Sequence, residues 1–117
     1  MAPLYESVPP RGYGGTERVV SYLTEELVRL GHDVTLFASA DSRTSARLVP
    51  MCPRALRSSA DVVDPLAWHL VMLERVAQLA SEFDVLHFHV DYLHFPLSRR
   101  LGVPNVTTLH GRLDLPE

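Results

Sequence analysis

"GGTERVVSYLTEELVRLGHDVTLFA", residues 14–38, contains the structural unit from which we derive the fold. Apolar residues recur at helical spacing over residues 16–30, and Gly31 follows as a helix cap. The apolar run that ends this stretch, residues 33–38, is typical of a short buried strand. The order of helix end, brief turn and apolar strand recurs at residues 84–89 and 103–110. This alternation predicts an α/β fold: a Rossmann-like, doubly wound parallel sheet with helices on both faces.

The remaining segments fit one domain over residues 1–117. The dipeptide Asp64–Pro65 predicts the start of a long helix, because Asp caps helix N-termini and Pro suits the first helical position. A short helix is expected over residues 96–101. Residues 39–63 are polar and contain turn-forming residues, so we expect them to be mostly loop, with a short strand near Leu48.

Composition excludes several classes of protein. The apolar fraction of 46% and the net charge of −3 are ordinary for a globular domain and do not favour nucleic-acid binding. Cys52 is the single cysteine, which leaves no disulfide framework or cysteine zinc site and fits a reducing compartment. The N-terminus does not resemble a signal peptide, and no apolar run reaches membrane-spanning length. We therefore expect a cytoplasmic protein.

Three groups of candidate site residues follow strands or precede a helix. They are Gly14–Gly15, residues 89–94 and His110–Gly111. In a parallel α/β sheet, ligands bind beyond the carboxyl ends of the strands, so these groups are expected at one rim. The glycine turn would hold phosphate against the helix N-terminus, where free N–H groups and partial positive charge meet. The alternative is an ordinary tight turn with Thr16 as the helix cap.

The glycine turn also indicates that a strand is incomplete. Such a turn usually follows the first, central strand, but only residues 1–5 precede this turn region. We therefore expect a fragment that lacks most of its first strand. The alternative is that residues 2–6 pair with the sheet as a stub.

Four landmarks occur in order within the stretches "PP..YGGTERVV..L..EL...GHDVTLFA", "FDVLHFH" and "VPNVTTLHG". Together they resemble the N-terminal domain of family-4 retaining glycosyltransferases with the GT-B fold. The resemblance covers nearly all of the chain. It implies part of an enzyme that moves a sugar from a nucleotide-sugar donor to an acceptor with retention of configuration. In that family, a C-terminal domain supplies most nucleotide-sugar contacts, and it is absent from these residues. Whether this chain alone is an enzyme is therefore left open.

The resemblance also assigns residues. It places His110 beside the donor sugar as the catalytic residue, and it places the donor phosphates at Gly14, Gly15, Thr16 and Gly111. This chain would supply the acceptor side of the cleft, through Glu17, His89, Asp91 and Tyr92. Neither a cofactor nor a metal is required in this interpretation, because a helix N-terminus and cationic side chains can neutralise a diphosphate. Peripheral membrane association of the full protein is compatible with it.

Two other functions compete with this one. His87, His89, Asp91 and His94 approach the H-x-H-x-D-H metal motif of the metallo-β-lactamase fold, although Tyr92 and Leu93 interrupt it; they would serve a metal-dependent hydrolase. The chain could instead be a non-catalytic interaction module. A missing central strand would expose sheet edges, so the isolated fragment is predicted to be poorly stable or to self-associate.

Overall fold

Helices and parallel strands alternate along the chain in the computed structural model, which describes residues 1–111 and 114. Strand β1 pairs in parallel with β2, and β3 pairs in parallel with β4. The α/β class and the parallel pairing are thus confirmed, and the short strand expected near Leu48 is β2. The elements are α1 (Gly15–Arg29), β1 (Thr35–Ala38), β2 (Arg47–Pro50), η1 (Leu56–Ser58), α2 (Pro65–Leu79), η2 (Ala80–Glu82), β3 (Leu86–Phe88), α3 (Phe95–Ser98) and β4 (Asn105–Thr107).

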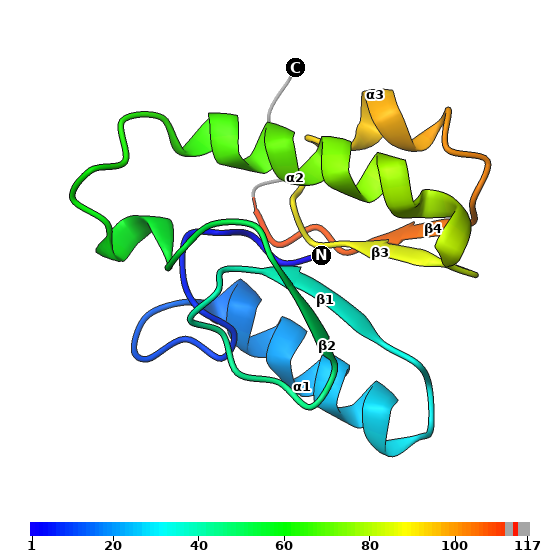
Figure 1. Cartoon of the computed structure of the whole chain (residues 1–117), viewed down its shortest axis with the longest axis horizontal. Helices are drawn as coiled ribbons and strands as arrows, with labels where there is room; N and C mark the ends of the chain where they lie inside the picture. Colours follow the sequence, from blue (N-terminus) through cyan, green and yellow to red (C-terminus); the bar gives the residue numbers. More distant parts are fainter. Residues whose placement is uncertain (112–113, 115–117) are drawn as a thin grey trace.

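The first two residues lie between the two strand pairs (Figure 1). The amino group of Met1 donates to the carbonyl of His87 at 2.7 Å, and the N–H of His89 donates to the carbonyl of Met1 at 3.2 Å. The N–H of Ala2 donates to the carbonyl of Phe37 at 3.0 Å. Residues 1 and 2 therefore connect β3 to β1, as a short stub would. The continuous doubly wound sheet remains a prediction, because the strands form two separate two-stranded sheets.

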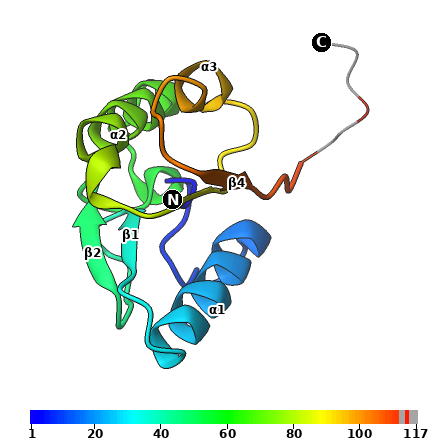
Figure 2. The same cartoon turned by 90° about the vertical axis from the view of Figure 1, so that its right-hand side faces the viewer.

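Helices cover both sides of the strands. Helix α1 lies on one side, and α2 and α3 lie on the other (Figures 1 and 2). Successive residues of β1 point to opposite sides, as a strand requires. Leu36 packs in an apolar cluster with Val20 of α1, whereas Phe37 packs in the cluster that contains Met72 of α2. Burial of both faces explains why the strand is apolar at every position from Leu36 to Ala38.

The helix ends follow the sequence signals with two exceptions, the first of which is α3, because it ends at Ser98 and not at residue 101 as expected. The Asp64 carboxylate accepts the N–H of Leu66 at 2.9 Å, which confirms this residue as the cap of α2. Gly31 has φ 91° directly after α1, the left-handed conformation that closes a helix. The alternative of Thr16 as the cap of α1 is wrong. Gly14 caps this helix with φ 136° and ψ 71°, a backbone conformation in which only glycine is free of strain.

Candidate functional site

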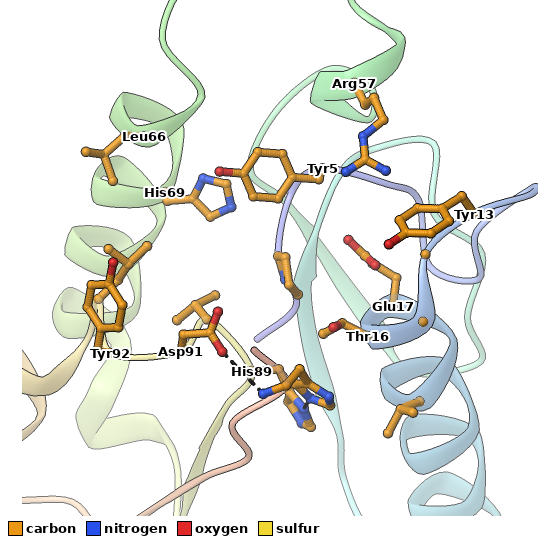
Figure 3. Close-up of a pocket in the computed structure, with 17 residues that line it drawn as sticks. Tyr5, Tyr13, Thr16, Glu17, Arg57, Leu66, His69, His89, Asp91 and Tyr92 are labelled. Atoms are coloured by element: carbon orange, nitrogen blue, oxygen red, sulfur yellow. Dashed lines mark hydrogen bonds between the residues drawn. The ribbon is translucent and has the colours of Figure 1, made fainter. Parts of the chain in front are cut away.

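An open cleft of about 920 Å³ lies at the carboxyl ends of β3 and β4, beside the N-terminus of α1 (Figure 3). Segments far apart in the sequence meet here, as the rule for parallel sheets predicts. Eight of the predicted site residues line this cleft: Gly14, Gly15, Thr16, Glu17, His89, Asp91, Tyr92 and His110. Gly111 adjoins it, since a Cβ on Gly111 would lie 3.5 Å from the Asp91 carboxylate.

The N-terminus of α1 presents the glycine turn to the cleft. A Cβ on Gly15 would meet no atom within 4 Å, so the space over this residue is open. The first turn of a helix leaves backbone N–H groups without helical partners and carries partial positive charge. This end of α1 therefore has the physical properties of an anion site, and the absence of a side chain lets a ligand approach the backbone closely.

Glu17 projects from the same turn and is only 5% exposed. Its carboxylate accepts the N–H of Glu6 at 3.3 Å. Burial raises the pKa of Glu17, while the backbone N–H groups of Glu17 and Glu6 act in the opposite direction. Figure 3 shows the carboxylate between Tyr5 and Tyr13, on the side of the cleft opposite Asp91 and Tyr92. A carboxylate held in this way can accept a hydrogen bond from a hydroxyl group that enters the cleft.

His110 is held at two points by the segment that follows β3. Its Nε2 lies 2.9 Å from Nδ1 of His89, and its backbone N–H donates to Oδ1 of Asp91 at 3.3 Å. Asp91 has φ 49°, a left-handed conformation that is uncommon for residues other than glycine. Strain of this kind concentrates at functional sites. The geometry thus fixes both the ring and the main chain of His110 at the edge of the cleft.

The cleft is also lined by residues with polar side chains that sequence reasoning did not assign to it, among them Tyr5, Tyr13, Arg57 and His69. Arg57 lies 2.9 Å from the Glu6 carboxylate and 5.3 Å from the centre of the Tyr13 ring. It is a cation beside the glycine turn, but no motif surrounds it in the sequence. His69 is one of the buried residues of α2. It reaches the cleft because the tertiary packing places α2 opposite the N-terminal turn of α1, which no local sequence signal indicates.

The ring of His69 is locked in one protonation state. Its Nε2 accepts the N–H of Leu4 at 3.0 Å, so Nδ1 carries the proton and donates to the Pro65 carbonyl at 2.7 Å. The side chain is 2% exposed, and burial lowers its pKa. A second proton on Nε2 would break the bond to Leu4. His69 is therefore a neutral wall of the cleft.

The four residues of the proposed metal site are not gathered. His87 and His89 do share a face, with ring centroids 4.1 Å apart, as the two-residue period predicts. His94, however, stacks on Phe88 at 3.9 Å and pairs with the Thr107 hydroxyl at 2.7 Å. Within residues 1–111 and 114, no three His, Cys, Asp or Glu side chains are placed to hold a metal ion. The geometry gives the metal-dependent hydrolase no support.

Buried histidines should make folding stability depend on pH. Burial lowers the pKa of His69 and His87, and burial with neighbouring positive charge lowers that of His89 from 6.5 to about 3. The unfolded chain therefore binds more protons below pH 6.5, so stability falls as the pH drops. From His89 alone we expect a loss of about 2 kcal/mol between pH 7.5 and pH 5. Glu17 offsets part of this loss, because its raised pKa favours proton binding in the fold.

Urea unfolding at the two pH values measures this effect. In His89→Asn, which lacks the titrating ring, the pH dependence should be smaller. A free energy of unfolding that stays constant from pH 7.5 to pH 5 in the wild-type chain would contradict the expectation.

The fold is α/β, and its open cleft lies at the carboxyl ends of parallel strands. Residues 13–116 match the model of Glycosyltransferase Family 4, and the chain belongs to this family. The family-level resemblance drawn from the four landmarks is therefore confirmed. No curated protein matches the chain. Among the described residues, no helix is both long and apolar enough to cross a membrane.

Proposed function

We propose that this chain forms the acceptor side and part of the diphosphate site of a glycosyltransferase that retains the configuration of the transferred sugar. Membership of Glycosyltransferase Family 4 supports the general activity. One observation supports the finer proposal: the glycine turn and His110 line the same cleft. Gly15 and His110 are 95 positions apart in the sequence. In this proposal the chain is the N-terminal half of a GT-B fold, and a second domain completes the donor site.

The donor diphosphate would bind at the N-terminus of α1. The departing nucleoside diphosphate gains negative charge in the transition state, so fixed N–H groups near it lower the barrier. Gly14, Gly15 and Thr16 supply the turn, and Gly111 lies beside Asp91, whose carboxylate a Cβ on Gly111 would contact at 3.5 Å. His110, across the cleft, would orient the donor sugar and stabilise the same charge. In this proposal no metal ion is needed to neutralise the phosphates.

The acceptor would bind between the two walls of the cleft. Glu17 on α1 offers a buried carboxylate, and Tyr92 after β3 offers a ring that is 65% exposed. Asp91 already accepts one hydrogen bond from His110 and retains a second oxygen. A sugar or another polyhydroxylated acceptor suits these groups, because carboxylates accept from hydroxyl groups and aromatic rings cover apolar faces.

Nucleotide binding by Gly15→Ala tests the phosphate site. The probes are UDP, GDP and ADP, titrated into the chain by calorimetry. The added Cβ meets no protein atom but enters the space where phosphate would contact the backbone, so we expect about tenfold weaker binding. Gly12→Ala is the matched control, because its Cβ also meets no atom and Gly12 does not line the cleft. If Gly15→Ala binds each nucleotide as tightly as the wild type, the proposed phosphate site is wrong.

A further inference from the structure

His89 occupies an unusual position for a residue that contacts an acceptor. It lines the cleft, but it is only 3% exposed. Its Nδ1 lies 2.9 Å from Nε2 of His110, and the two ring centroids are 5.2 Å apart. One ring nitrogen of His89 is therefore committed to the residue that we propose as catalytic.

The surroundings of His89 favour its neutral form. The His87 ring stacks on it at 4.1 Å, and the amino group of Met1 bonds to the carbonyl of His87. Burial is the main cause that lowers the pKa of His89 to about 3, and the charges of Met1, His87 and His110 add to it. Asp91 lies nearby, but its carboxylate accepts from the main chain of His110. At neutral pH the His89 ring therefore has one N–H and one lone pair.

The two possible directions of this hydrogen bond require different protonation states of the His110 ring. A protonated His110 carries hydrogen on both ring nitrogens, so its partner at Nε2 must then accept. If His89 accepts at Nδ1, the same hydrogen bond persists when His110 is neutral. If His89 donated instead, the bond would break each time His110 gained a proton. Only the arrangement with His89 as acceptor holds in both charge states of His110.

We propose that His89 is a positioning residue for His110. Nδ1 of His89 accepts the Nε2–H of His110, which leaves Nδ1 of His110 as the ring nitrogen available to the cleft. That nitrogen offers a lone pair when His110 is neutral and an N–H when His110 is protonated, so it can bond a phosphate oxygen after taking up a proton. The catalytic importance of this arrangement rests on the proposed glycosyltransferase function, but the hydrogen bond itself does not.

Nitrogen-15 NMR of the histidine-labelled chain tests the assignment directly. In the wild type we expect hydrogen on Nε2 of His110 and a scalar coupling across the bond to Nδ1 of His89. His89→Asn places an amide oxygen near the position of Nδ1 and should keep hydrogen on Nε2 of His110. His89→Gln carries its amide further out, near the position of Nε2, and should release His110 to a mixture of tautomers.

The outcomes separate a positioning role from a structural one. Hydrogen on Nδ1 rather than Nε2 of His110 in the wild type would overturn the proposal, as would an unchanged tautomer in folded His89→Gln. If His89→Gln does not fold, the scalar coupling in the wild type still tests the proposal, and the absence of this coupling would contradict it. No nucleotide is present, so a failure here is distinct from a failure of the proposed function. In a transfer assay, kcat should fall about tenfold in His89→Gln and recover in His89→Asn, with KM unchanged.

Discussion

Gly14→Ala is expected to lower the free energy of unfolding by about 2–4 kcal/mol. Gly14 has φ 136°, where an L side chain is strained, and an added Cβ would lie 2.8 Å from Cβ of Pro10 and 3.2 Å from the Glu17 carboxylate. The carbonyl of Gly14 also accepts the N–H of Arg18, the first hydrogen bond of α1. Strain at this position would be relieved only by moving the start of the helix.

Two neighbouring glycines make this prediction specific. Neither Gly12→Ala nor Gly15→Ala places a Cβ within 4 Å of another atom, and neither residue has a positive φ. Both variants should stay within about 0.5 kcal/mol of the wild type, with Gly15→Ala slightly stabilised because alanine favours the helix over glycine. Urea unfolding at pH 7.5 measures all three. Equal midpoints for Gly14→Ala and Gly12→Ala would show that the turn tolerates a side chain.

Local signals predicted much of the fold. The start of α2 was readable because Asp64 and Pro65 act on the backbone next to them, and the end of α1 was readable from Gly31. Strand β2 was harder to place. Its residues are intermediate or exposed and carry no continuous apolar run. The structure identifies β2 by its parallel pairing with β1, in which Leu36 lies opposite Leu48. The composition of β2 alone does not indicate a strand.

The residues that line the cleft could be predicted where the strand topology places them. They could not be predicted where loop conformations place them. Parallel strands bring His89 and His110 to the same rim whatever the details of packing. Arg57 and Tyr5 reach the cleft only because η1 and the residues after the N-terminal stub fold against each other: the N–H of Leu56 donates to the carbonyl of Leu4. His94 shows the opposite case. The turn at Asp91 takes it away from His87 and His89, although the sequence places all three within eight residues.

His110→Ala should lower kcat of the proposed transfer reaction by about 10²–10³, the loss typical of removing one donor from a developing negative charge. The fold should persist, because His110 is half-buried at the rim and its backbone N–H to Asp91 is unchanged by the substitution. Loss of the ring leaves Nδ1 of buried His89 without its partner, so we expect a destabilisation of about 1 kcal/mol.

The measurement is the initial rate of sugar transfer or donor hydrolysis with UDP-, GDP- and ADP-sugars, on protein shown by circular dichroism to be folded. His32→Ala is the matched control, because His32 is exposed and does not line the cleft. A catalytic role for His110 requires a loss of rate that His32→Ala does not share. A folded His110→Ala with the wild-type rate would instead assign charge stabilisation to the N-terminus of α1 and to Arg57, and Gly15→Ala would then carry the larger kinetic effect.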